Sequence, residues 1–276
     1  MKVKFIADSS SDMLDADFED LTTVPLTIST DNESWLDENL EISEMLEKLE
    51  THKGRTYTAC PGVTSWLKLY EGADIIYVAT ITGALSGTYN SAMAAKQIFA
   101  GEHPEVKIHV FDTLSTAGEI RLLMEKLMEL HRAGKSFEEV CREAQEYQKQ
   151  TGLLFALKSL HNLAQNGRIS KALASALGVL GISIIGMAGA QGTLQPIGKS
   201  RGDRKTVNRL REELVKTGCR GGKLRISHVE NEELAEQLRE ALTEQFPGAD
   251  IQVYKSRGLC SYYAERGAVL IGYEKQ

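Results

Sequence analysis

Strand-like and helix-like segments alternate along the first half of the chain. Four apolar runs have the length and residue types of buried strands: Val3 to Ala7, Val24 to Ile28, Asp74 to Ile81 and Val106 to Phe111. Helical spacing covers Ile42 to Leu49, Thr64 to Tyr70, Thr88 to Phe99, Ala117 to His131 and Phe137 to Tyr147. Ser136 and Glu139 form the capping box expected at the start of the last of these helices. This alternation predicts an α/β fold with a mostly parallel sheet and helices on both faces.

A long uncharged run from Ala172 to Gly198 opens the second half of the chain. On length alone it would allow a membrane span, but glycines and Pro196 interrupt it. Its helical spacing at Leu173, Ala176, Leu177 and Leu180 changes to strand-like spacing at Ile182, Ile184 and Ile185. The run therefore predicts a buried helix followed by a buried strand.

Further strands and helices follow this run. We expect a helix over Asp203 to Lys216, a strand over Leu224 to His228, a helix capped by Asn231, and strands over Ile251 to Tyr254 and Ala268 to Ile271. These elements predict a smaller α+β domain over residues 156–276, after an α/β domain over residues 1–155.

Composition and charge exclude several classes of protein. The 276 residues are 42% hydrophobic and 25% charged, which excludes disordered and fibrous chains. The net charge is −6 and the basic residues are scattered, so nucleic acid is not an expected partner. The four cysteines include no C-x-x-C pair, which favours reduced thiols in a cytoplasm. The first apolar run is too short for a signal peptide, and we expect a cytoplasmic protein without a transmembrane segment.

The segment from Thr80 to Ala92 combines glycines and hydroxyl groups where a strand leads into a helix. Gly83 and Gly87 allow a sharp turn, and the free N–H groups of the helix start favour an anion. Neutral donors at the same place come from Thr82, Ser86 and Thr88. Because no lysine follows Gly87 and G-x-G-x-x-G is absent, a small carboxylate suits this loop better than a nucleotide phosphate. The alternative is a tight turn that binds nothing.

Three other segments carry candidate binding groups. Thr58 lies in an expected turn and would reach the same cleft if the strand ends converge; otherwise it belongs to an ordinary turn. The acidic run Asp8 to Asp12 has the residue types of a magnesium site, but such turns are more often helix caps, and no metal is expected. Arg168 adjoins the uncharged run, and its guanidinium needs hydrogen-bond acceptors. They come either from a ligand's carboxylate or from the protein itself, in which case Arg168 would tie the two domains together.

Seven motifs occur together in the order of a known family. They are DSSSD at Asp8, T-x-x-P at Thr58, ALSGTYNSA at Ala84, VFDTLSTAGE at Val110, NGRISKA at Asn166, SRGDRKT at Ser200 and the closing GAVLIGY. From end to end the chain resembles the DegV family of fatty-acid-binding proteins. The resemblance implies one long-chain fatty acid buried between two domains and no cofactor. It also implies a role as the lipid-carrying subunit of a bacterial fatty acid kinase, whose ATP-binding subunit phosphorylates the bound carboxylate.

The resemblance also implies which residues hold the fatty acid. The family's carboxylate-binding threonine matches Thr58, its serine pair falls on Thr82 and Gly83, and its arginine matches Arg168. The full expected set is Thr58, Thr82, Gly83, Ser86, Arg168 and Tyr263.

The sequence departs from the family's motifs in three of its segments. The family's T-S-Q-P motif is T-A-C-P here, from Thr58 to Pro61. Gly83 replaces one serine of the family's serine pair, and Tyr263 stands where the family has histidine. Lipid binding is expected to survive these changes, whereas the loss of the histidine bears on the kinase partnership. Arg201 and Arg204 match a surface segment of the family and are candidates for partner contact; alternatively they are solvated charges at a helix start.

An alternative function is a serine hydrolase acting on a small ester or lipid. Ser86, Asp112 and His228 follow one another in the order found in α/β hydrolases. However, the nucleophile motif is G-x-S-x-G, and the sequence G-A-L-S-G places Ser86 one residue late. A lone histidine such as His228 is more often a buried structural residue. A pure protein-interaction module would leave the hydroxyl-rich loop unexplained, so we expect a lipid-binding protein without catalytic residues.

Overall fold

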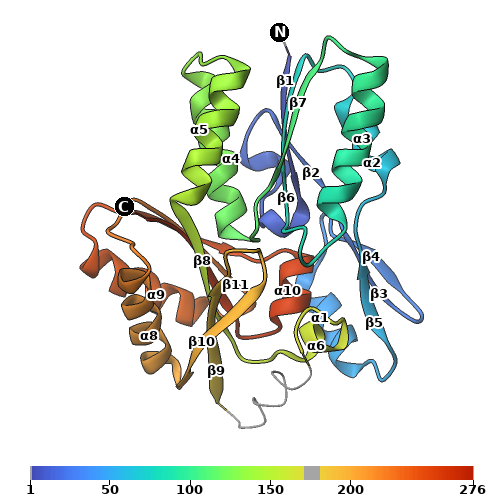
Figure 1. Cartoon of the computed structure of the whole chain (residues 1–276). Helices are drawn as coiled ribbons and strands as arrows, with labels where there is room; N and C mark the ends of the chain where they lie inside the picture. Colours follow the sequence, from blue (N-terminus) through green and yellow to red (C-terminus); the bar gives the residue numbers. More distant parts are fainter. Residues whose placement is uncertain (1, 171–180, 276) are drawn as a thin grey trace.

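The computed structural model describes residues 2–170 and 181–275 of the chain. Its strands form three sheets, with four strands in the order β2-β1-β6-β7, six in the order β10-β9-β8-β13-β11-β12, and three in the order β4-β3-β5 (Figure 1). The predicted α/β class is confirmed. Among the described residues, no helix combines the length and apolar character needed to cross a bilayer.

The four-stranded sheet is parallel throughout, as predicted. Its strands are β1 (Val3–Asp8), β2 (Leu21–Val24), β6 (Ile75–Thr80) and β7 (Lys107–Asp112). The flanking helices are α2 (Val63–Tyr70), α3 (Thr88–Glu102), α4 (Gly118–Arg132) and α5 (Phe137–Lys149). Helices α4 and α5 cover one face of the sheet, and α2 and α3 cover the other (Figure 1). Phe5 and Ala7 pack toward α4 and α5, while Ile6 packs toward α2 and α3, because side chains alternate across a strand. The capping box of Ser136 and Glu139 starts α5 as predicted.

The six-stranded sheet is mostly antiparallel. Its strands are β8 (Thr151–Leu157), β9 (Ile182–Ala188), β10 (Leu194–Arg201), β11 (Lys223–His228), β12 (Asp250–Lys255) and β13 (Val269–Glu274). Only β11 and β12 pair in parallel among its described strands. Helices α8 (Asp203–Lys216) and α9 (Glu232–Gln245) cover one face. All of β8 belongs to this sheet, and the domain boundary expected near residue 155 stays a prediction.

Several expectations from the sequence were wrong in detail. The strand expected over Val24 to Ile28 is split, because β2 ends at Val24 and β3 (Thr27–Thr30) joins a different sheet. Pro25 lies in the break, where it cannot donate a ladder hydrogen bond. The turn expected around Thr58 is strand β5 (Thr56–Ala59), which pairs with β3, as does β4 (Ser34–Leu36).

Two further predictions concern helices. Asn231 occupies the N-cap position of α9, but its side chain donates to the Gly267 carbonyl and does not cap the helix. The helical spacing at Leu173, Ala176, Leu177 and Leu180 lies outside the described residues.

Short helices fill the space between the sheets. They are α1 (Ile42–Thr51), α6 (His161–Gln165), α10 (Gly258–Ala264), and the 3₁₀ turns η1 (Ser9–Ser11) and η2 (Asp15–Asp17). At the start of α4, Gly118 packs directly against the backbone of the six-stranded sheet. A Cβ atom on Gly118 would lie 2.3 Å from the Arg225 carbonyl oxygen, and one on Gly272 would lie 2.1 Å from the Gly118 carbonyl carbon. The two halves therefore meet closely at this point.

Candidate functional site

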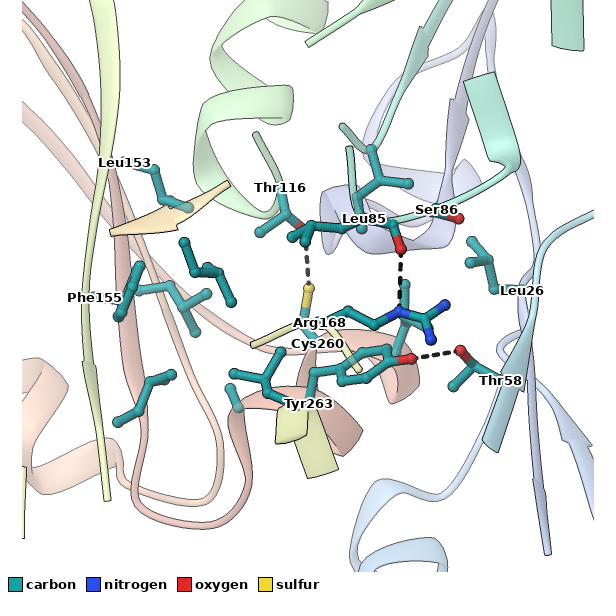
Figure 2. A pocket seen from close by; sticks show the side chains of 17 residues that line it. Leu26, Thr58, Leu85, Ser86, Thr116, Leu153, Phe155, Arg168, Cys260 and Tyr263 are labelled. Atoms are coloured by element: carbon teal, nitrogen blue, oxygen red, sulfur yellow. Dashed lines mark hydrogen bonds between the residues drawn. The ribbon is translucent and has the colours of Figure 1, made fainter. Parts of the chain in front are cut away.

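A cavity lies between the six-stranded sheet and the loops at the carboxyl end of the parallel sheet (Figure 2). Its empty volume is about 670 Å³, including space open to solvent. Its lining is mostly apolar and consists of Leu26, Thr58, Ile81, Leu85, Ser86, Thr116, Leu153, Phe155, Leu157, Leu163, Arg168, Leu194, Leu259, Cys260, Tyr263, Ala264 and Leu270.

Polar side chains gather at one end of this cavity, which we call the head end and define by Thr58, Ser86, Arg168 and Tyr263. The hydroxyl oxygens of Thr58 and Tyr263 lie 2.7 Å apart. The Arg168 Nε donates to the Leu85 carbonyl at 3.1 Å, and the guanidinium carbon lies 5.9 Å from the centre of the Tyr263 ring. Figure 2 shows Arg168 between the β6–α3 loop and Tyr263. Strand β5, two loops and helix α10 thus supply one polar cluster.

The electrostatics of the head end favour an anion. Burial raises the pKa of Tyr263, and this effect outweighs the hydrogen bond from Thr58 and the nearby charge of Arg168. The phenol is therefore a neutral hydrogen-bonding group at physiological pH. Among the described lining residues, Arg168 is the one that carries a full positive charge. A guanidinium beside neutral hydroxyls is suited to a single carboxylate.

The opposite end of the cavity, which we call the tail end, is one face of the six-stranded sheet. Leu153, Phe155 and Leu157 alternate along β8 and face the cavity. Leu154 and Ala156 between them pack toward α8 and α9. This alternation follows from the pleat of the strand and produces a continuous apolar wall. In Figure 2, Leu153 and Phe155 lie on the side away from Arg168 and Thr58.

Buried carboxylates hold α10, which carries Tyr263, against the first half of the chain. Asp12 accepts from the Arg257 backbone N–H at 2.7 Å. Asp37 accepts from the backbone N–H groups of Gly258 at 2.7 Å and Leu259 at 2.8 Å, and its carboxylate lies 3.7 Å from the Arg257 guanidinium. These contacts satisfy N–H groups at the helix start that have no partner within the helix.

The DSSSD segment has a structural part in the site. Asp8 accepts from Ser10 within the segment and from the Ile81 backbone N–H at 2.6 Å, so it fixes the β6–α3 loop that leads to Ser86. Burial raises the pKa of Asp8 to about 6 and that of Asp12 to about 7. Across residues 2–170 and 181–275, no group of three or more His, Cys, Asp or Glu side chains is placed to hold a metal ion. The helix-cap interpretation of the segment is therefore the one that its contacts support.

Not all of the expected ligands meet at the cavity. Thr58, Ser86, Arg168 and Tyr263 do, whereas Thr82 and Gly83 are absent from its described lining. Thr82 instead accepts from the Ala84 N–H at 3.2 Å, and Gly83 donates to Asp112 at 3.1 Å.

The turn between β9 and β10 explains the environment of Thr82. A Cβ atom on Gly192 in this turn would lie 2.0 Å from the Thr82 hydroxyl oxygen, so the turn packs directly on Thr82. Arg201 and Arg204 are exposed, at the end of β10 and the start of α8, and neither lines the cavity.

The three residues of the hydrolase alternative have separate partners. The Ser86 hydroxyl lies 2.8 Å from that of Thr88. Asp112 accepts from the backbone N–H groups of Gly83 and Leu114, and His228 Nδ1 accepts from the Asn231 N–H at 3.2 Å. The described contacts do not join serine, aspartate and histidine into a triad.

Sequence reasoning missed Asp37 and Arg257, which meet at the start of α10, and Phe155 at the tail end. Asp37 and Arg257 lie in no motif that was singled out, and their contact spans 220 residues of chain. The short apolar run from Leu153 to Leu157 was a usable signal for a buried strand that contains Phe155.

Fold and cavity together define a class of protein, in which a parallel α/β unit and an antiparallel sheet enclose an apolar cavity with a cationic, hydroxyl-rich end. A family model described as an uncharacterised protein of the DegV family matches residues 2–276. The chain belongs to the DegV family.

Similar proteins cover the whole chain. A DegV domain-containing protein of Streptococcus gordonii is 43% identical over 282 residues, covering 99% of each chain. The crystal structure of a DegV family protein from Eubacterium eligens loaded with heptadecanoic acid has a TM-score of 0.97 and 49% identity, covering 99% of this chain and 100% of that one. The Streptococcus pneumoniae Fatty Acid Kinase (Fak) B3 protein loaded with linoleic acid has a TM-score of 0.96 and 43% identity, covering 100% of both chains.

Proposed function

We propose that this protein binds one long-chain fatty acid, with the acyl chain against the tail end and the carboxylate at Thr58, Ser86, Arg168 and Tyr263. The observation that carries the proposal is the polarity of the cavity, which is apolar along most of its lining and has one guanidinium with hydroxyls at one end. An amphipathic molecule with a single anionic head matches this distribution. The fatty acids named for the Eubacterium eligens and Streptococcus pneumoniae proteins support the same ligand class.

Most of the binding free energy comes from the acyl chain. A palmitate-sized chain has about 14 methylenes, and at ~0.8 kcal/mol each they contribute on the order of 11 kcal/mol before the costs of association. The head end has to orient the ligand and keep the carboxylate hydrogen-bonded. Loss of one hydroxyl should therefore weaken binding without abolishing it.

We propose that the protein is a carrier that presents its fatty acid to an ATP-dependent acyl kinase. The Streptococcus pneumoniae relative is named as a fatty acid kinase B protein, and this chain is similar to it over its full length. The described contacts of Ser86 offer no catalytic base, which fits a carrier. A cytoplasmic location is part of the proposal, since all four cysteines are free thiols.

Lipid extraction tests the ligand. The purified protein, denatured and analysed by mass spectrometry, should release a long-chain fatty acid at about one equivalent. The delipidated protein should bind the free acid more tightly than its methyl ester, because the ester has no charge to offer Arg168. An apo mass in native mass spectrometry, together with no thermal shift on adding palmitate or oleate, would reject the proposal.

Valine substitutions test the head end. Thr58→Val keeps the shape but removes a hydroxyl, and should weaken fatty-acid binding by about 1–3 kcal/mol while affecting the methyl ester less. Thr82→Val makes the same chemical change at a residue whose hydroxyl faces the β9–β10 turn, and should leave the preference for acid over ester unchanged. Equal losses in the two variants would instead place Thr82 on the carboxylate.

Acyl phosphate formation tests the partnership. With an ATP-dependent fatty acid kinase, the loaded protein should yield an acyl phosphate that hydroxylamine traps as a hydroxamate. Arg201 and Arg204 remain candidates for the contact, because both are exposed and lie outside the cavity. The double change Arg201→Ala and Arg204→Ala should lower acyl phosphate formation and leave fatty-acid affinity unchanged. An unaltered rate would remove these two arginines from the interface.

A further inference from the structure

Phe155 and Gly186 form a cross-strand pair at the tail end of the cavity. The two residues are directly opposite in the antiparallel ladder of β8 and β9, so their side-chain positions share one face of the sheet. That face is the cavity wall, since Phe155 lines the cavity and is 2% exposed. Phe155 has Leu270 as its partner on the other side, in β13.

The aromatic ring covers the position where a side chain on residue 186 would be. A Cβ atom built on Gly186 would lie 2.3 Å from both Cε2 and Cζ of Phe155. Real Cβ atoms do not approach other atoms so closely. The ring can therefore lie over β9 only because residue 186 is glycine. Any side chain at position 186 would force the ring to rotate, and its Cβ would also press on the Gln195 carbonyl oxygen of β10, 3.0 Å away. Leu270 on the opposite side restricts that rotation, which leaves the cavity as the space into which the ring turns.

We propose that Phe155, seated over Gly186, sets the length of acyl chain that the cavity accepts. This inference rests on the proposed binding of a fatty acid and adds which pair of residues determines its length. The ring is the bulkiest side chain of the tail wall, and Figure 2 places it away from Arg168 and Thr58. With the carboxylate held at the head end, the depth left in front of the ring limits the number of methylenes that can be buried.

Three variants test the proposal against a saturated series of lauric, myristic, palmitic, stearic and arachidic acids, each displacing a fluorescent fatty acid from delipidated protein. Gly186→Ala pushes the ring into the cavity and should move the preferred acid toward shorter chains. Phe155→Leu shortens the side chain and should move it toward longer ones. Each methylene that loses or gains a buried position should change Kd roughly fourfold. In the double variant the smaller side chain at position 155 leaves room for the added methyl group, so the preference should return toward that of the wild type.

Gly198→Ala is the matched control. It adds the same methyl group to β10 in the same sheet, where the nearest atoms, at 3.2 to 3.6 Å, belong to the flexible end of Arg209. The order of affinities across the series should equal that of the wild type.

The outcomes separate the inference from the function on which it rests. If the wild type binds none of the acids, the proposed function fails. If the wild type binds them but Gly186→Ala and Phe155→Leu keep its order of affinities, Phe155 does not set the chain length and the inference is overturned. If Gly186→Ala does not fold, as judged by circular dichroism and thermal unfolding, Phe155→Leu decides alone: a shift toward longer acids supports the inference, and an unchanged order overturns it.

Discussion

The two ends of the cavity are built in different ways. The tail end is one face of a sheet, where Leu153, Phe155 and Leu157 alternate along a single strand. The head end joins four segments that are distant in sequence, and the hydrogen bond between the hydroxyls of Thr58 and Tyr263 spans 205 residues. Tail residues are held by ladder bonds and apolar packing, whereas the helix that carries Tyr263 is held by Asp12 and Asp37.

Because the two ends are built differently, they should respond differently to mutation. An apolar wall tolerates changes of volume, with graded effects on stability and ligand preference. A buried carboxylate that accepts from two N–H groups and faces a buried guanidinium, as Asp37 does, has no neutral replacement that keeps every partner satisfied. Substitutions of the buried carboxylates that hold α10 should therefore affect folding, while those at the tail end should change ligand preference.

Removal of the Asp37 carboxylate should have the largest effect. Asp37→Ala leaves the N–H groups of Gly258 and Leu259 without acceptors and the buried Arg257 without its anion. Breaking a buried charge pair on one side costs about 3–5 kcal/mol. Urea unfolding should show a loss of this size.

Asp203→Ala is the control for that substitution. Asp203 is 45% exposed and lies 3.5 Å from Lys158, which is 40% exposed. Exposed pairs contribute little, so the free energy of unfolding should barely change. Similar losses at Asp37 and Asp203 would contradict the importance of the buried carboxylates.

Asp12 should make stability depend on pH. Burial is the main cause that raises its pKa from 3.8 to about 7, against the lowering effect of the Arg257 N–H, so the folded state holds the proton more tightly than the unfolded one. The free energy of unfolding should therefore fall as pH rises from about 4 to 7, by about 1.4 kcal/mol per unit from this group. Asp12→Asn removes that slope. As pH rises from about 5 to 7, the free energy of unfolding of the variant, measured in urea, should increase by about 2–3 kcal/mol relative to that of the wild type. Parallel curves of unfolding free energy against pH would contradict the raised pKa of Asp12.

Tyr263→His should introduce a pH dependence of fatty-acid binding. A protonated imidazole at this position attracts the carboxylate, and the attraction is lost as pH rises through the histidine's pKa. Affinity for a fluorescent fatty acid should fall about tenfold between about pH 6 and 8, which corresponds to one unit of pKa difference. The wild type should change little, because its buried phenol stays neutral. Superimposable pH curves would mean that Tyr263 does not face the carboxylate.

Tyr263→Phe should have the smallest effect. It keeps the ring but removes the hydroxyl that bonds Thr58 and that, in the proposed complex, bonds the carboxylate. A neutral hydrogen bond contributes about 1 kcal/mol, so fatty-acid affinity should fall roughly fivefold at every pH. An unchanged affinity would show that the Tyr263 hydroxyl has no part in holding the ligand.

The sequence predicted the regular parts of the fold well, because burial on both sides of a parallel sheet leaves a strong apolar signal. The runs at Val3 and Asp74 became β1 and β6, and the start of α5 was identified from its capping box. The three-stranded sheet was missed because its strands are only three or four residues long and half exposed, as in β4 and β5. Such short strands depend on their neighbours more than on their own pattern.

The head end was predictable only in part. The residues themselves identified the hydroxyl-rich loop, Thr58 and Arg168 as candidates, and the family resemblance added Tyr263. The structure brings Thr58, Arg168 and Tyr263 together. Local sequence contains no signal that Asp37 meets the start of α10, since that contact is decided by the packing of two halves of the chain. Thr82 was expected to bind the carboxylate because it is a threonine in the hydroxyl-rich loop. In the structure, the β9–β10 turn occupies the space beside its hydroxyl.

The contact between Gly118 and Gly272 restricts how this chain can evolve. A core pair of side chains can drift, because a larger residue on one side is offset by a smaller one on the other. Backbone against backbone leaves no partner volume to exchange, since a Cβ on either residue would fall within 2.3 Å of main-chain atoms. A library that encodes every amino acid at both positions, selected for folded protein, should return glycine at each, whichever lipid the rest of the cavity has been altered to hold.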